Sequence, residues 1–214
     1  MKRLFILTIS TVLLVANLFA NEHIKVTSSK ELEYHNHETY EVWYDSENKN
    51  PAYVVWDLTN VDAIESDASN NRPSSSFVAC GSSAKHTDCV GYDRGHMCPN
   101  NDRDWNVEAA KNTFKMCNVC PQSAALNRGI WKKYEKRGHE IAKKNGLVTI
   151  ICGPIYSSKT SVYLKNVIRI PDAFFKIFYY SNKVECYVFG QDNSIKESSI
   201  EEIERLANIR IDLI

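Results

Sequence analysis

The spacing of apolar residues along the chain predicts several β-strands. Residues 40–59 alternate aromatic and β-branched positions on both sides of a polar turn at 48–51, a pattern that is typical of a β-hairpin. Residues 112–122 predict a short strand that ends at Pro121. Further runs rich in β-branched and aromatic residues predict strands in three later segments, residues 147–156, 166–180 and 184–190.

Two segments change to helical spacing. In the first, apolar or small residues recur on one helical face, at Ile130, Trp131, Tyr134, Gly138 and Ile141. Asn145 and Gly146 then provide a stop signal. The second segment, residues 199–207, predicts an acidic amphipathic helix. Earlier in the chain, residues 66–83 predict a polar loop that contains Arg72. Strands before and after a central helix predict an α+β fold with a mixed, mainly antiparallel sheet.

The N-terminal segment differs from the rest of the chain. Residues 1–20 begin with Lys2 and Arg3, continue with an uncharged apolar run and end on Ala20, which is typical of a secretory signal peptide. We therefore expect an exported protein, periplasmic or secreted, that has no stable membrane association after signal removal. Residues 21–214 show no linker or repeat and predict a single domain.

The overall charge of the chain excludes a strong global attraction to nucleic acid. The full chain has 26 basic and 26 acidic residues, and removal of Lys2 and Arg3 leaves a net charge of −2. Positive charge is concentrated in residues 126–146, where seven basic residues accompany only Glu135 and Glu140. This segment is the candidate phosphate-binding surface, with Arg128 and Lys132 as candidate substrate contacts. A solvated helix face with no ligand is the alternative.

All seven cysteines lie after the predicted signal segment, which favours an oxidising compartment and some disulfide bonds. An odd number leaves at least one thiol without an intrachain partner. Cys117 and Cys120 lie three residues apart in a predicted strand, where their side chains would point to opposite faces, so each is expected to pair with a distant cysteine. Similar local sequences suggest one such pair, Cys98 with Cys120.

The segment "DRGHMCP", residues 93–99, contains side chains suited to phosphodiester hydrolysis. An imidazole titrates near neutrality and can take a proton from water, which makes His96 a candidate general base. Arg94 offers a planar guanidinium that matches phosphate oxygens. Mg²⁺ prefers oxygen ligands, which Asn127 can supply. Glu135 lies two helical steps of four residues further on and can hydrogen-bond metal-bound water.

These motifs carry a family resemblance. "DRGH" followed by "MCP", then "NVCPQSAALNRGIWKKYE" at 118–135 and "GPIY" at 153–156, resembles the DNA/RNA non-specific endonucleases of the ββα-metal, or His-Me finger, superfamily. The resemblance covers most of residues 21–214. It implies a central ββα-metal motif and hydrolysis of DNA and RNA to 5′-phosphate ends, with Mg²⁺ as the cofactor and Mn²⁺ as a substitute.

The resemblance also implies roles for individual residues. His96 resembles the general base and Asn127 the protein ligand of one Mg²⁺. Arg94 and Glu135 resemble the phosphate-binding arginine and the helix acid near the metal waters, and Asn118 resembles the asparagine of the second strand, which we class with the catalytic residues. Arg72 is the candidate for a further substrate-binding arginine, and Asp93 is expected to hold the motif loop in place.

Several alternatives stay open from the sequence. A secreted nucleic-acid-binding module of the same fold could lack turnover, and the "CNVC" segment allows a thiol-disulfide or zinc reading. His35 and His37 could form an adventitious metal pair, because alternate residues of a strand share a face. An inhibitor protein and a homodimer are also open as partners.

Overall fold

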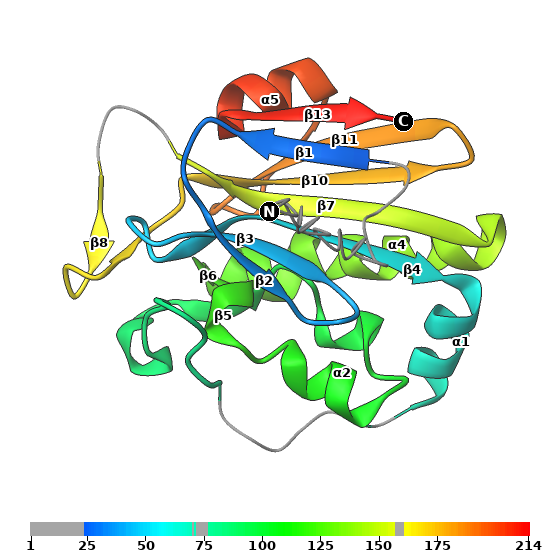
Figure 1. Ribbon diagram of the computed structural model, residues 1–214, viewed down its shortest axis with the longest axis horizontal. Helices are drawn as coiled ribbons and strands as arrows, with labels where there is room; N and C mark the ends of the chain where they lie inside the picture. Colours follow the sequence, from blue (N-terminus) through cyan, green and yellow to red (C-terminus); the bar gives the residue numbers. More distant parts are fainter. Residues whose placement is uncertain (1–23, 70, 72–76, 157–160) are drawn as a thin grey trace, which may run out of the picture.

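The computed structural model describes residues 24–69, 71, 77–156 and 161–214 (Figure 1). The predicted signal segment and Arg72 lie outside these residues. The largest sheet has seven strands in the order β12-β11-β10-β7-β4-β3-β2, and every neighbouring pair is antiparallel. Its strands are β2 (Glu33–Asn36), β3 (Glu41–Asp45), β4 (Asn50–Thr59), β7 (Leu147–Ile155), β10 (Ala173–Tyr180), β11 (Lys183–Gly190) and β12 (Ile195–Ser198). The predicted hairpin and the α+β class with a mainly antiparallel sheet are confirmed.

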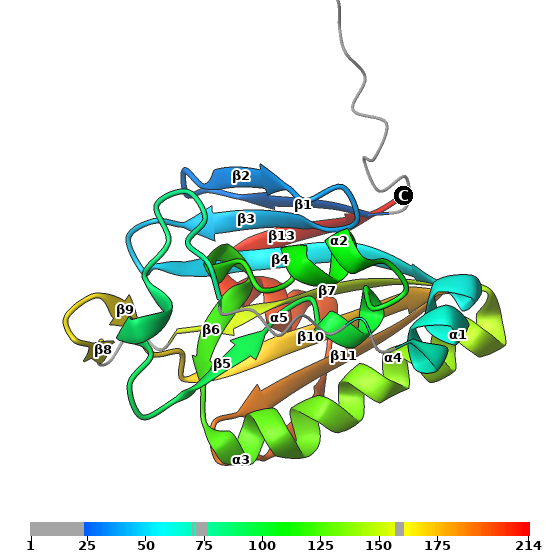
Figure 2. The same ribbon diagram turned by 90° about the horizontal axis from the view of Figure 1, so that it is seen from below.

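Both faces of this sheet are buried, because alternate residues of the central strands enter two different cores. In β4, Trp56 and Leu58 point into one core, and Tyr53 and Val55 point into the other. The second core is closed by a ribbon of β1 (Ile24–Ser28) and β13 (Ile209–Leu213) and by helix α5 (Ile200–Ala207). Helix α4 (Lys132–Asn145) runs along the opposite face (Figure 2).

The motif residues belong to an insertion between the two central strands. β4 pairs directly with β7, and the chain between them forms β5 (Asp93–His96), β6 (Val119–Gln122) and α4. β5 and β6 pair antiparallel, with His96 opposite Val119. The sheet face therefore supports a β-hairpin and a helix that the chain inserts between β4 and β7.

The helix predicted from periodicity is present but not continuous. A short helix α3 (Ala124–Leu126) leads into the π turn η4 (Asn127–Trp131), which is kinked at Gly129, where φ of −99° and ψ of −114° are not helical. Helix α4 then ends at Gly146, which has a positive φ of 91°. At the π turn, the side chain of Asn193 accepts a hydrogen bond from the Ile130 amide at 2.8 Å. A side chain that enters a helix in this way breaks the regular hydrogen-bond ladder.

Two segments differ from the sequence predictions. The segment 112–122 contains only four strand residues, because it begins at the end of helix α2 (Val107–Asn112) and then forms a 3-10 turn at Met116–Asn118. Helix α1 (Asn60–Ala68) extends into the predicted loop and is held by a capping box between Thr59 and Asp62. Helix α5 was predicted correctly, and Ser199 caps it.

The predicted pair of Cys98 with Cys120 was wrong, whereas the prediction that Cys117 pairs with a distant cysteine is confirmed. Cys80 and Cys117 form the disulfide, whereas Cys98 and Cys120 are free and fully buried. Burial raises the pKa of the Cys120 thiol well above its ordinary value, which opposes formation of a reactive thiolate. The geometry therefore does not support the thiol-disulfide alternative at this cysteine.

Among the described residues, no helix is both long enough and apolar enough to cross a membrane.

Candidate active site

Strand β5 presents its side chains alternately to two sides. Arg94 and His96 share one side, while Asp93 and Gly95 share the other. A Cβ built at Gly95 would lie 2.1 Å from Oε1 of buried Gln122, so any larger residue there would require the Gln122 side chain to move. The Gln122 side chain thus fills the space beside Gly95, and the two short strands can approach closely.

Aromatic rings hold the His96 side chain in place. Its imidazole lies 5.1 Å from the Phe77 ring and 4.9 Å from the Phe114 ring, measured between centroids. The guanidinium carbon of Arg94 lies 5.0 Å from the centroid of the same Phe77 ring. Trp131 also fixes this strand, because its Nε1 donates to the His96 carbonyl at 3.2 Å. The imidazole is therefore oriented by packing on two sides and by its own backbone.

The Asp93 carboxylate joins β5 to the start of the helix. It accepts hydrogen bonds from Asn127 Nδ2 at 3.0 Å and from Arg128 Nε and Nη2, both at 2.8 Å. The hydrogen bonds from Arg128 contribute most to a lowered pKa of Asp93, so the carboxylate stays charged. Because Asp93 engages Nδ2 of Asn127, the amide oxygen is the atom of Asn127 that can coordinate a cation. The predicted anchoring role of Asp93 agrees with this geometry.

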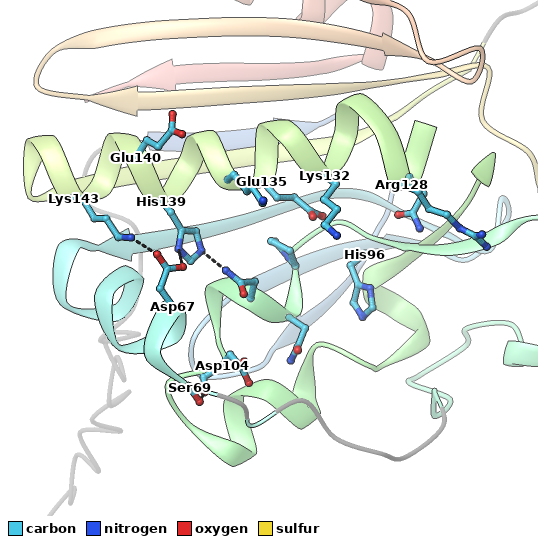
Figure 3. Close-up of a pocket in the computed structure, with 15 residues that line it drawn as sticks. Asp67, Ser69, His96, Asp104, Arg128, Lys132, Glu135, His139, Glu140 and Lys143 are labelled. Carbon is cyan, nitrogen blue, oxygen red and sulfur yellow. Dashed lines mark hydrogen bonds and ion pairs between the residues drawn. The ribbon is translucent and has the colours of Figure 1, made fainter. Parts of the chain in front are cut away.

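Helix α4, the π turn and the loop after β5 line one open pocket of about 910 Å³. The pocket brings together three predicted site residues, His96, Asn127 and Glu135 (Figure 3). Two predicted substrate contacts, Arg128 and Lys132, also line it. Arg94 and Asn118 are not among the lining residues, and Arg94 is exposed beside Phe77.

Trp131 does not share the pocket-facing side with Asn127 and Glu135. On a regular helix, residues 127, 131 and 135 would share one face because they are spaced by four, but the kinked turn η4 spans Asn127–Trp131. Trp131 is fully buried, where its ring packs on Phe174 and Phe189. The π turn allows the helix to direct Asn127 into the pocket and Trp131 into the core, and π turns occur often at functional sites.

Glu135 lines the pocket and is also influenced by the charge of a buried lysine, Lys176. Burial raises the pKa of Glu135 to about 7, and the positive charge of Lys176 acts against this shift. Lys176 is only 1% exposed, and its Nζ lies 4.0 Å from the centroid of the Trp131 ring. Lys176 was not among the site residues predicted from the sequence. The signal that could have identified it is a lysine in the middle of the apolar run at 173–180.

A second ionisable group that the sequence analysis did not identify is His139, at the far end of the pocket. Its Nε2 lies 3.0 Å from Oδ1 of buried Asp102, and its Nδ1 lies 3.0 Å from Oδ1 of Asp67. Burial acts to lower the pKa of His139, but the hydrogen bond and charge of Asp102, with the charge of Asp67, raise it overall. Its spacing of four residues from Glu135 on one helix face was the available signal.

The basic surface of the helix is smaller than the sequence predicted. Asp93 pairs with Arg128, Glu185 with Arg137, and Asp67 with Lys143. Four basic residues line the pocket, at Arg128, Lys132, Lys136 and Lys143, and four acidic ones accompany them, at Asp67, Asp104, Glu135 and Glu140. Within the described part of the chain, no ion pair is recorded for Lys132 or Lys136.

Asn118 has a position that does not fit a catalytic contact. It is completely buried, and its Oδ1 accepts from the Cys98 amide at 2.9 Å. Its Nδ2 donates to the carbonyls of Cys98 at 2.8 Å and Thr113 at 3.0 Å. All of these partners are backbone groups, so Asn118 positions the turn that follows His96. This geometry favours a positioning role for Asn118, and its catalytic role stays a prediction.

The oxygen groups of the pocket fit a hard cation such as Mg²⁺. The amide oxygen of Asn127 and the carboxylate of Glu135 line the same pocket as His96. Within the described residues, no three histidine, cysteine or acidic side chains of this pocket bring one ligand atom each within 4.8 Å of one another. Mg²⁺ commonly binds through few protein ligands and keeps several waters, so a single amide oxygen is compatible with this ion.

A model of the family described as DNA/RNA non-specific endonuclease matches residues 19–212. The chain belongs to this family. It is similar to Nuclease 1, mitochondrial, of Schizosaccharomyces pombe, with 34% identity over 124 residues, which cover 54% of this chain and 38% of the relative. It is also similar to human Endonuclease G, mitochondrial, with 30% identity over 97 residues, which cover 41% of this chain and 33% of the relative. The matched segments thus span about a third of these relatives, as the shares of 38% and 33% show.

The fold of this family member also matches a solved structure. A crystal structure of the EndoG/EndoGI complex superposes with a TM-score of 0.75 and 24% identity, and covers 84% of this chain and 85% of that chain. At this identity the likeness supports the fold. It agrees with the predicted ββα-metal class.

The comparisons correct one prediction for this endonuclease-family chain. Export to the periplasm or outside the cell was predicted from residues 1–20, but the fission yeast and human relatives are named as mitochondrial proteins. The prediction of an exported protein is therefore wrong. A short apolar run after two basic residues did not identify the compartment.

Replacement of Asn118 tests its positioning role in this family member. Asn118→Ala removes three hydrogen bonds and leaves buried backbone groups without partners, so we expect a loss of about 3 kcal/mol in the free energy of unfolding. Urea denaturation measures this loss. Asn100→Ala, which removes one hydrogen bond of 3.4 Å, is the matched control and should cost less than about 1 kcal/mol. Equal losses in the two variants would contradict the assigned role.

The raised pKa of His139 predicts a pH-dependent contribution to stability. The charged imidazole stabilises the fold fully below its unfolded pKa of about 6.5, and this contribution is lost as the pH rises through the raised folded pKa. The free energy of unfolding should therefore fall as the pH rises above about 6.5, with a slope of at most about 1.4 kcal/mol per pH unit from this group. His139→Gln keeps an N–H donor and should flatten the slope. An unchanged slope in chemical denaturation would refute this assignment.

Proposed function

We propose that the chain is a Mg²⁺-dependent endonuclease that hydrolyses phosphodiester bonds of DNA and RNA and leaves 5′-phosphate ends. The observation that carries the proposal is the common pocket of His96, Asn127 and Glu135. The family membership supports the same activity. The nuclease names of the yeast and human relatives support it further, although each match covers only part of the relative.

In this proposal His96 acts as the general base. Its imidazole accepts a proton from the attacking water, and the rings of Phe77 and Phe114 keep it from turning away. Asn127 holds the cation through its amide oxygen, while Asp93 fixes the orientation of the amide. When bound, Mg²⁺ would offset negative charge on the phosphate and on the leaving oxygen. Glu135 would accept hydrogen bonds from water around the cation.

Positive side chains near the pocket would position the substrate backbone. Arg94 lies on the same side of β5 as His96 and is exposed, so its guanidinium is available to phosphate oxygens. Lys132 and Lys136 line the pocket and would contact neighbouring phosphates. Arg128 would have to exchange its contact with Asp93 for a phosphate, so we assign it a smaller part in binding. Contacts to phosphate are independent of base sequence, which agrees with a substrate range that includes DNA and RNA.

A plasmid cleavage assay tests the proposed activity. The purified chain should nick and then degrade supercoiled plasmid, and also RNA, in the presence of Mg²⁺, and EDTA should stop both reactions. His96→Ala should lower the rate by about 10²- to 10⁴-fold, because the general base is lost. His86→Ala, which changes a histidine outside the pocket, is the control and should retain the wild-type rate. Intact substrates after incubation of the wild-type chain with Mg²⁺ or Mn²⁺ would favour the non-catalytic binding module instead.

The salt dependence of binding tests the two lysines. In a His96→Ala background, Lys132→Ala and Lys136→Ala should each weaken duplex DNA binding and lower the slope of log affinity against log salt by about 0.9. Fluorescence anisotropy with a labelled duplex measures both effects. Lys25→Ala, on strand β1 at the opposite face of the sheet, should leave the slope unchanged. Identical slopes in all three variants would exclude the predicted phosphate contacts.

A further inference from the structure

Four side chains that can bind a soft metal ion meet outside the active-site pocket. They are His35 on β2, His37 just after it, Cys80, and Cys117 in the 3-10 turn before β6. Ligand atoms of His35, Cys80 and Cys117 all lie within 4.8 Å of one another. The Nε2 atom of His37 lies 3.3 Å from Cys117 Sγ and 3.8 Å from Cys80 Sγ. The two sulfur atoms of the disulfide therefore lie close to two imidazoles, whose rings are stacked with 6.2 Å between centroids.

The distances to His37 match a tetrahedral zinc site. With Zn–S bonds of about 2.3 Å and Zn–N bonds of about 2.1 Å, a sulfur and a nitrogen ligand of one tetrahedral ion lie about 3.6 Å apart. The two distances from His37 Nε2, 3.3 and 3.8 Å, lie on either side of this value. The two sulfur atoms of such a site lie about 3.8 Å apart, so the disulfide must be broken before the ion can bind. Side-chain rotation of Cys80 and Cys117 then supplies the required separation.

The surrounding chain holds the histidines and cysteines together by contacts that do not depend on the disulfide. Gly81 has a φ of +53°, and a Cβ there would lie 2.5 Å from Cε1 of His35, so this glycine lets the loop rest on the imidazole. The Ser82 amide donates to Glu33 Oε2 at 3.2 Å, and the same oxygen lies 3.5 Å from His35 Nε2. A carboxylate beside a histidine is a common companion of metal-binding imidazoles.

The four side chains of the site are only partly exposed to solvent. Cys117 is fully buried and His37 is 6% exposed, whereas His35 and Cys80 are half-buried. Removal of the disulfide would leave two thiols and two imidazoles close together, two of these four groups with little access to water. A divalent ion satisfies all four groups at once.

We propose that, in the reduced chain, Cys80, Cys117, His35 and His37 bind one Zn²⁺ ion as a structural site that replaces the disulfide. A dithiol reductant transfers two electrons and two protons to the sulfur atoms of Cys80 and Cys117 and becomes a disulfide itself. Zn²⁺ then binds the two thiolates, and the two thiol protons pass to solvent. The zinc site does not depend on nuclease activity.

The position of Cys117 gives the site a structural consequence. The next residue, Asn118, holds both backbone groups of Cys98, two residues after His96. Either link, the disulfide or the metal, ties the loop at Cys80 to the turn that carries Asn118. The chain would therefore keep the support of its His96 strand in both oxidising and reducing surroundings.

Cobalt titration of the full chain tests the proposal, because Co²⁺ reports the geometry and the thiolate ligands of a zinc site through its absorption spectrum. The chain reduced with a phosphine and then freed of reductant should bind one Co²⁺, with thiolate charge-transfer bands and the intense visible bands of tetrahedral cobalt. One equivalent of Zn²⁺ should remove these bands. The oxidised chain should show neither feature. Absence of the bands in the reduced chain, or equal bands in the oxidised chain, would overturn the proposal.

Variants separate this site from the five other cysteines. In the reduced chain, His35→Ala and His37→Ala should each lower Zn²⁺ affinity by about tenfold or more, measured by competition with a chromogenic chelator. Cys80→Ser with Cys117→Ser should abolish the thiolate bands. Cys186→Ser and His86→Ala are the matched controls and should bind as the wild type does, with circular dichroism to confirm that each variant is folded. Wild-type affinity in both histidine variants would assign the metal to other cysteines and overturn the proposal.

Discussion

The carboxylate of Asp93 is the contact on which the arrangement of the pocket depends. It lies on the strand that carries His96, and it accepts hydrogen bonds from both Asn127 and Arg128 at the start of the long helix. The strand and the helix belong to different parts of the chain, so no local preference sets their distance. One charged group with three donors fixes that distance and the orientation of the Asn127 amide together.

The large sheet supports the Asp93 contact, because the strand that carries His96 and the helix are both held against it. Trp131 is buried on the sheet face between Phe174 and Phe189, and its Nε1 also reaches the backbone of His96. Asn118 fixes the chain after His96 from the other side through three hydrogen bonds. A side chain held by packing and by hydrogen bonds to backbone has few alternative positions, which is what precise placement of a base requires.

The sequence was sufficient for the parts of the fold that repeat a local pattern. Alternation located the β3–β4 hairpin, and helical spacing with Gly146 located the end of α4. The motifs around His96 and Asn127 predicted the shared pocket of His96, Asn127 and Glu135, although Arg94 and Asn118 do not line it. Features made by distant contacts were missed. Asn193 shapes the π turn from a loop 63 residues away, and Cys80 pairs with Cys117 over 37 residues, which neither periodicity nor spacing encodes. The short helix α2 could have been predicted from local sequence, because Asn106 followed by Glu108 is a typical helix N-terminus.

Burial and the charge of Lys176 act in opposite directions on the ionisation of Glu135. Burial favours the neutral form of its carboxyl group, while Lys176 beneath the helix favours the charged form. Lys176 is itself stabilised in the core by the face of the Trp131 ring, so the residue that supports the His96 strand also supports this cation. A cation entering the pocket would add to the effect of Lys176 and favour the carboxylate further. Burial outweighs Lys176 and raises the pKa of Glu135 to about 7, and a bound cation would act with Lys176 to lower it again.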